Sequence, residues 1–254
     1  NALHPLLKSV ADMTDMHTYN PTWGTDDKNG HGTNMAGLAI YGDLTQVLSN
    51  PQTIALTHKL ESVKVYPDYG SNEKELYGAI TKESVVRVEI EQPHATRTFC
   101  MAVTAPDDRD RGRPSSWSAS IDAISSGYDD EQQRLVIISA GNTDDGKRHY
   151  YPDNNITDQV HDPGQAWNAL TVGAYTEKVF LNQEHCDAGW QVIAEFGDLS
   201  PASCTSMTWD KAWPIKPDIV MEGGNQALSP HNGTADYIDE GLQLYAKYFE
   251  NLWD

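Results

Sequence analysis

Two short stretches of the sequence carry side chains suited to acyl-transfer chemistry. In the first, residues 29–37 read NGHGTNMAG, so His31 stands between glycines where a loop gives way to a helical pattern. Histidine is the usual general base, and the glycines let a substrate approach its imidazole closely. A single loop histidine is more often a structural residue, so the context of His31 must decide its role.

The second stretch is an apolar run that ends in small residues and an amide. Residues 136–142 read VIISAGN, and Asn142 follows directly after the run. At the end of a strand, a side-chain amide that points into a cleft can donate to an oxyanion. The alternative is that Gly141 and Asn142 form an ordinary turn, since both residue types are common in turns.

The surrounding sequence predicts the elements that position these side chains. Nearly continuous apolar runs predict buried strands at residues 62–66, 98–104, 135–140 and 170–174. Helical spacing predicts helices at residues 35–41, 73–82 and 116–125. In the last of these, Trp117, Ile121 and Ile124 fall on one face. Strands that alternate with helices indicate an α/β fold with a mostly parallel sheet, where ligands bind at the carboxyl ends of the strands.

Two further segments have mixed patterns. Valines alternate through residues 85–90 as in a strand, although the neighbouring residues suit a continuing helix. Residues 236–253 carry apolar side chains at helical spacing, but Gly241 weakens the helix prediction there.

Composition limits the class of protein. The chain has 254 residues with no repeat or low-complexity linker, which predicts one domain over residues 1–254. Its 18 basic and 37 acidic residues give a net charge of −19, which disfavours nucleic acid as a partner. No apolar run approaches the roughly 18 residues of a membrane span. Three scattered cysteines mildly favour a reducing, cytoplasmic compartment.

Several segments, in a fixed order along the chain, resemble motifs of the subtilisin-like serine peptidases, or subtilases. The family's HGTHVAG motif is similar to HGTNMAG at residues 31–37, and its A-G-N strand end is similar to residues 140–142. Further similar segments are HPLL at residues 4–7, VKV at 63–65, TVGA at 171–174 and KPDI at 216–219. The resemblance spans about residues 4–224 and implies a three-layer α/β/α fold with a mostly parallel central sheet.

The resemblance also implies roles for individual residues. His31 would be the general base that takes the proton of a serine hydroxyl, and Asn142 would donate to the tetrahedral oxyanion. Residues on two facing segments would bind substrate: Ala102, Val103 and Thr104 on one, and Ser139, Ala140 and Gly141 on the other. The family has Ser-Leu-Gly at residues 102–104, so the first specificity pocket is expected to differ in depth.

The two other members of the family's triad have no match in the 254 residues. The family aspartate lies in a strand end before the HPxL segment, and the serine lies in a G-T-S-x-A-x-P helix start after the KPDI strand. Ser200, Ser203 and Ser206 precede that strand, so we expect them to be structural. Asp26 and Asp27 are not expected to replace the aspartate. We therefore expect an internal segment of the catalytic domain of a serine endopeptidase, inactive by itself and incomplete at both ends.

Two alternatives stay open. One is a pseudopeptidase that binds peptides or proteins without cleaving them, favoured by the altered residues 102–104 and by Met221–Glu222 where the family has Ala-Pro. The other is a natural truncated product with a structural role. In the main interpretation the partner is a polypeptide substrate, with no nucleic acid and no membrane, and the oligomeric state is left open.

No cofactor or metal is expected. The nine histidines include no HExxH motif, and His185–Cys186 has no second pair nearby. Some subtilases bind structural calcium, for which the acidic residues 107–110 and 144–145 are candidates. Neither stretch follows an EF-hand pattern, so a solvated acidic surface is the default expectation.

Overall fold

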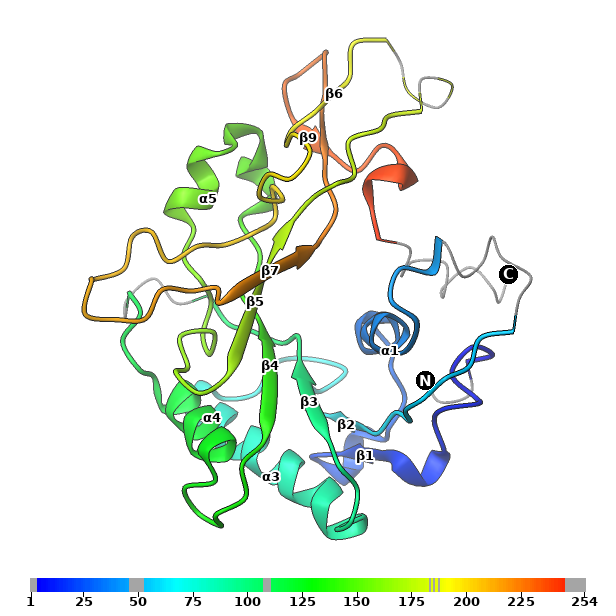
Figure 1. Cartoon of the computed structure of the whole chain (residues 1–254), viewed down its shortest axis with the longest axis vertical. Coiled ribbons are helices and arrows are strands. Elements are labelled where there is room, and N and C mark those ends of the chain that lie inside the picture. The colour runs from blue at the N-terminus through cyan, green and yellow to red at the C-terminus, as the bar shows by residue number, and fades with distance from the viewer. Residues whose placement is uncertain are drawn as a thin grey trace. The chain divides into compact units, whose positions relative to one another are not determined.

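The computed structural model describes residues 4–45, 53–106, 111–182, 184, 186 and 188–244 (Figure 1). The chain divides into two compact units, one formed by Asn1–Thr96 with Tyr245–Asp254 and the other by Arg97–Leu244. The prediction that residues 1–254 form one domain stays a prediction.

In its described residues, the first unit contains a short parallel sheet and the helices α1 and α3. Strands β1 (Met16–Thr18) and β2 (Ser62–Lys64) pair in parallel, with Met16 opposite Ser62. The helices and 3-10 turns that the structure describes in this unit are η1 (Met13–Asp15), η2 (Pro21–Trp23), α1 (His31–Tyr41), η3 (Lys74–Leu76) and α3 (Tyr77–Glu91). A core of Leu7, Val10, Ala11, Ile40 and Leu44 joins α1 to the segment that precedes β1.

Helices α1 and α3 differ from the sequence prediction in their bounds. Helix α1 begins at His31 rather than at Met35, because Gly30 adopts a left-handed conformation (φ 84°) that ends the loop there. Helix α3 continues to Glu91 and includes residues 85–90, which settles the ambiguous segment as helical. Its inward face is formed by Ile80, Ser84 and Val88, so helical rather than alternating spacing governs these valines.

The second unit is built on a four-stranded parallel sheet in the order β3 (Thr98–Met101), β4 (Leu135–Ser139), β5 (Leu170–Tyr175) and β7 (Ile219–Glu222) (Figure 1). The predicted α/β architecture with a mostly parallel sheet is therefore confirmed. Burial is less complete than the apolar runs predicted: Val136 and Ile138 of β4 are buried, whereas Thr98 and Cys100 of β3 are exposed. Exposure of β3 follows from its place at the edge of this sheet.

Helix α4 (Ser116–Ser126) lies beside β4 in the same unit. Trp117, Ile121 and Ile124 are buried on one face, as their spacing predicted. The helix begins with a capping box, in which the Ser115 hydroxyl accepts from the Ser118 N–H and the Ser118 hydroxyl accepts from the Ser115 N–H. It ends at Gly127, which is left-handed as helix C-caps commonly are.

The rest of the second unit is less regular. It contains η4 (Asp145–Tyr150), α5 (Asp153–Thr157) and an antiparallel sheet of β6 (Gln191–Val192), β8 (Ala227–Leu228) and β9 (Ala235–Asp236). The helix predicted from residue 236 is wrong as far as residue 244, where only the single turn η5 (Glu240–Leu242) is helical. Leu242 is instead buried with Leu181 and Ala227. The remainder of that prediction, from residue 245, lies outside the described residues.

The KPDI segment at residues 216–219 forms hydrogen bonds with the start of β5. The buried Lys216 ammonium donates to the Ala169 carbonyl (3.1 Å) and pairs with Asp218 Oδ2 (2.7 Å). The same carboxylate oxygen accepts from the Thr171 N–H at 2.7 Å, and the Asp218 N–H donates to the Thr171 carbonyl. These contacts fix the start of β5 against the loop that leads into β7.

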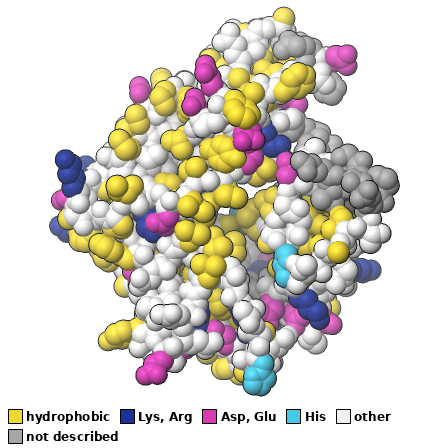
Figure 2. Space-filling model, viewed as in Figure 1, with side chains coloured by type: hydrophobic (Ala, Val, Ile, Leu, Met, Phe, Trp, Pro, Cys, Tyr) yellow, Lys and Arg dark blue, Asp and Glu magenta, His cyan; other side chains and the backbone are white. Residues whose placement is uncertain are grey.

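Strand β7 exposes apolar side chains. Ile219, Val220 and Met221 are 43%, 39% and 58% exposed, and Figure 2 shows hydrophobic side chains gathered over the region of β5 and β7. In the described part of the chain, no helix is long and apolar enough to cross a membrane.

Candidate active site

His31 is the first residue of α1, and its side chain is exposed. Thr33, Gly37 and Ile40 form the buried face of that helix. Because Ile40 belongs to the core of the first unit, the helix is anchored, while His31 and Gly32 at its start are exposed. The structure thus presents the imidazole at the start of a fixed helix.

Asp27 caps the helix that His31 begins. Its Oδ2 accepts from the Thr33 N–H (2.6 Å) and hydroxyl (2.7 Å), and its Oδ1 accepts from the Gly30 and Asn29 N–H groups. Burial raises the pKa of Asp27, but the hydrogen bonds from Thr33, Gly30 and Asn29 outweigh it and hold the pKa below its usual value. A carboxylate with these partners serves as a helix cap.

Lys64 ties this loop to β2. Its ammonium donates to the Asp26 carbonyl at 2.8 Å and pairs with Asp68. Lys64, the middle residue of the VKV segment, therefore binds the backbone of Asp26, which immediately precedes the capping residue Asp27. Sheet, loop and helix of the first unit together determine where His31 lies.

Asn142 follows β4 at the carboxyl end of the parallel sheet, and its side chain is exposed. Gly141 has φ 89°, so the chain does turn here, as the alternative interpretation held. The turn and the exposed amide occur together, because a left-handed glycine after a strand redirects the next residue out of the sheet. An exposed amide at this edge can donate to an oxyanion that forms beside it.

The backbone after Asn142 is firmly held. Asn142 forms an antiparallel bridge with Ser203, and the Thr143 N–H donates to the Ala202 carbonyl at 3.1 Å. The buried Thr143 hydroxyl donates to the Pro201 carbonyl at 2.7 Å. The segment around residues 200–203 is therefore the support of the Asn142 turn.

His161 links the two segments predicted to bind substrate. Its backbone N–H donates to the Ala140 carbonyl at 2.9 Å, and Nδ1 of its imidazole lies 3.3 Å from the Thr104 hydroxyl. A Cβ on Gly141 would fall 2.3 Å from Cγ of the imidazole. The sequence carries no local signal for His161, because its neighbours Gly141 and Thr104 are 20 and 57 residues away along the chain.

The predicted strand at residues 98–104 is shorter in the structure. Strand β3 ends at Met101, so Ala102, Val103 and Thr104 lie beyond it. The chain is next held at Ala105, which exchanges two backbone hydrogen bonds with Asp162. Strand β3 is shorter because, beyond Met101, the chain pairs with Asp162, while the backbone of the neighbouring His161 pairs with Ala140, which directly follows β4.

The three closely spaced serines each have a structural contact. The buried Ser203 hydroxyl oxygen accepts from the Ala174 N–H at 3.0 Å, and the Ser206 hydroxyl oxygen accepts from the Lys216 N–H at 2.9 Å. Ser200 is 2% exposed, and its hydroxyl oxygen accepts from the Ala202 N–H. These hydrogen bonds are consistent with a structural role for the three serines in the loop before β7.

Cys204 is fully buried beside these serines. Burial raises the pKa of its thiol to about 12, and the charge of Asp158 acts in the same direction. The thiolate needed for nucleophilic attack is therefore disfavoured at neutral pH.

No group of three or more His, Cys, Asp or Glu side chains that could hold a metal occurs within the described ranges. Of the calcium candidates, Asp144 caps η4 and pairs with Lys147, and Asp145 pairs with Arg148. Residues 107–110 and His185 lie outside the described residues.

Ala140, Gly141 and Thr104 are thus brought together around His161 within the second unit, and Asn142 directly follows Gly141. His31 belongs to the first unit. From the resemblance we predict that His31 and Asn142 share one cleft at the carboxyl ends of the strands, and this stays a prediction.

Comparison with protein families matches residues 1–253 to the model of the subtilase family. Comparison with curated proteins gives no match.

Proposed function

The chain belongs to the subtilase family, and on that premise we propose that His31 is the general base and Asn142 the oxyanion donor of a serine endopeptidase. Family membership makes the chain a subtilisin-like serine peptidase domain with polypeptide substrates. The observation that carries the two assignments is the family match over nearly the whole chain, which includes both segments. The exposure of both side chains at element ends supports them.

In the proposed mechanism, His31 removes the proton of a serine hydroxyl as the oxygen attacks the scissile carbonyl carbon. The carbonyl oxygen becomes an oxyanion, to which the Asn142 amide donates a hydrogen bond. His31 then gives its proton to the leaving amine, and water hydrolyses the acyl-enzyme by the same route. The 254 residues contain no match to the family's serine and aspartate motifs, so we expect no turnover from these residues alone.

Specificity in this proposal depends on His161. The imidazole fills space between Thr104 and Gly141, which belong to the two segments expected to flank the substrate. A side chain of that size leaves less room for the substrate residue before the scissile bond than a smaller one would.

The proposal is tested by labelling the full-length protein with a fluorophosphonate, which reacts only with an activated serine. We expect labelling that is lost in His31→Ala and retained in His58→Ala, an exposed histidine of the same unit. Labelling that survives in His31→Ala would contradict the assignment of the base.

The alternative is a domain that binds peptides without cleaving them. The end of β3 at Met101 favours it, because residues 102–104 do not continue the strand expected to pair with substrate. Peptide binding by a full-length protein that a fluorophosphonate does not label would establish this alternative.

A further inference from the structure

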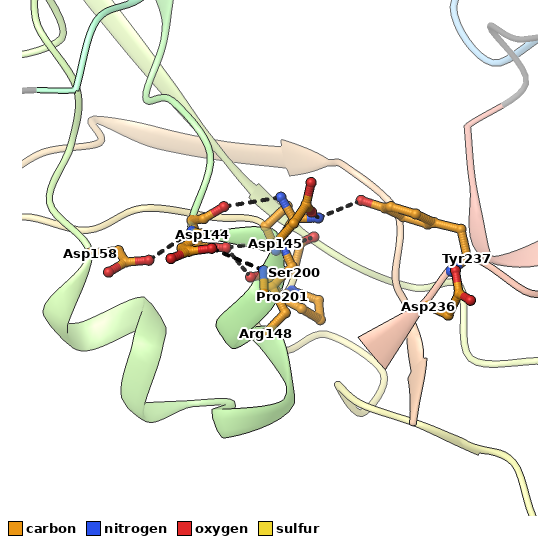
Figure 3. A network of polar contacts seen from close by, with 11 residues as sticks. Asp144, Asp145, Arg148, Asp158, Ser200, Pro201, Asp236 and Tyr237 are labelled. Atoms are coloured by element: carbon orange, nitrogen blue, oxygen red, sulfur yellow. Dashed lines mark hydrogen bonds and ion pairs between the residues drawn. The ribbon is translucent and has the colours of Figure 1, made fainter. Parts of the chain in front are cut away.

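Arg148 is a buried cation in the turn that follows Asn142. It is 4% exposed, lies in η4 and makes contacts with three residues (Figure 3). Nε donates to the Thr143 hydroxyl oxygen at 3.0 Å, Nη2 donates to the Thr143 carbonyl at 3.2 Å, and Nη1 donates to the Tyr237 hydroxyl oxygen at 2.8 Å. Nη1 also pairs with Asp145. The guanidinium therefore binds both the hydroxyl and the carbonyl oxygen of Thr143.

With these contacts, Thr143 has hydrogen bonds on all of its polar groups. Its hydroxyl accepts from Arg148 and donates to the Pro201 carbonyl, and its N–H donates to the Ala202 carbonyl. With its carbonyl also bound to Arg148, every backbone and side-chain polar group of Thr143 has a partner. Because Thr143 is hydrogen-bonded through all of these groups, the backbone of the neighbouring Asn142 is also restricted.

The two segments next to Thr143 and Arg148 have hydrogen bonds of their own. The buried Asn155 amide donates to the Ser200 and Ser203 carbonyls, both at 2.9 Å, and so fixes the loop that Thr143 contacts. On the other side, Tyr237 directly follows β9, whose pairing with β8 holds it in place. Arg148 thus connects Thr143, which is itself bonded to the loop at residues 201–202, to Tyr237.

Arginine suits this position because its planar guanidinium presents donors in a fixed fork. Lysine would supply one ammonium, which cannot reach the Thr143 hydroxyl, the Thr143 carbonyl and Tyr237 with the same geometry. Burying a cation is costly unless it is paired and hydrogen-bonded. Asp145 and the three acceptors meet that requirement here.

We propose that Arg148 is a positioning residue that holds the Asn142 amide in the orientation needed to bind the oxyanion. This inference rests on the proposed function. Arg148 acts through Thr143, and its effect is on the transition state rather than on substrate binding.

The test measures kcat and KM of the full-length protein carrying Arg148→Lys, alone and combined with Asn142→Ala. We expect Arg148→Lys to lower kcat by about 10- to 100-fold, the scale of a displaced catalytic group, while KM changes by less than about twofold. In the Asn142→Ala background, the same substitution should lower kcat no further, because the donor it positions is gone.

Arg134→Lys is the matched control. Arg134 is also largely buried in the second unit and pairs with Asp130, but it lies at the start of β4 rather than beside Asn142. It should change thermal stability without lowering kcat. If Arg148→Lys does not fold, Tyr237→Phe removes one acceptor only and should give a smaller fall in kcat that also vanishes in the Asn142→Ala background.

The outcomes separate this inference from the proposed function. Wild-type protein that a fluorophosphonate does not label overturns both. An active wild type in which Arg148→Lys and Tyr237→Phe keep normal kcat, or lower it equally with and without Asn142, overturns the role of Arg148 alone.

Discussion

The imidazole of His161 lies directly against Gly141, at the point where the chain leaves β4. A Cβ at residue 141 would be 2.3 Å from Cγ of His161, so the ring occupies the space that any larger residue at 141 would need. Thr104 contacts the same ring from the other segment expected to bind substrate. The volume between these segments is therefore set by a side chain that belongs to neither.

Replacing His161 should change which substrates are cleaved. In His161→Ala, the space between Thr104 and Gly141 opens, and the preferred residue before the scissile bond should become larger and more apolar. Profiling the full-length protein against a peptide library measures this shift. The control is His149→Ala, which changes a histidine of the same unit whose ring contacts that of Tyr150. An unchanged His161→Ala profile would exclude His161 from the pocket.

Removing the Asn142 amide should slow catalysis without unfolding the protein. We expect Asn142→Ala to lower kcat by about 10²–10³-fold, the loss known for one oxyanion donor in subtilisin, itself a subtilase. Thermal stability should barely change because the side chain is exposed. Steady-state kinetics of the full-length protein measure the effect, with the exposed Asn232→Ala as control. A normal kcat would remove Asn142 from the mechanism.

Asp27 should stabilise the first unit in a pH-dependent way. Because its folded pKa is lowered, its contribution is present above its usual pKa near 3.8 and is lost as pH falls through the folded value. Asp27→Ala should cost about 0.5–2 kcal/mol, as for other lost helix caps.

Unfolding followed by circular dichroism at pH 7 and at pH 3 tests this prediction for Asp27. The difference between wild type and Asp27→Ala should shrink at pH 3. Asp26→Ala, which keeps the backbone carbonyl that Lys64 contacts, should behave as wild type. A difference that is equal at both pH values would argue against the cap.

The Lys216 contacts should matter for stability. Lys216→Met leaves the Ala169 carbonyl and one oxygen of Asp218 without this donor, at a cost of about 1–3 kcal/mol. Lys147→Met breaks an exposed pair with Asp144 and should cost at most about 1 kcal/mol. Denaturant titrations compare the two variants, and equal costs would show that burial adds nothing to the Lys216 pair.

Cys204 should be unreactive in the folded protein. With its pKa raised from 9.0 to about 12, the thiol stays protonated, and the stability gained by keeping it neutral is full below pH 9 and declines as pH rises toward 12. In a Cys100→Ser, Cys186→Ser variant, iodoacetamide at pH 8 should modify Cys204 only after denaturation. Rapid modification of the native protein would show that the site opens.

Local patterns in the sequence determined helix α4 and strands β3, β4 and β5 of the second unit. Trp117, Ile121 and Ile124 share a helix face because helical periodicity is a property of adjacent residues, and the apolar run at residues 135–140 forms a strand for the same reason. The predicted helix from residue 236 failed because Leu242 is buried against Leu181 and Ala227, and such tertiary burial overrides spacing.

The sequence by itself therefore determined the fold class and the segments that carry His31 and Asn142, since strand, helix and turn signals are local. Only the tertiary structure decided that β3 ends at Met101, that His161 lies between Thr104 and Gly141, and that Arg148 clamps Thr143. Each of these depends on contacts between residues that folding brings together, including Tyr237, which lies 89 residues from Arg148 along the chain. The physical reason is that hydrogen bonds and packing act through space, whereas sequence periodicity reports only on neighbours.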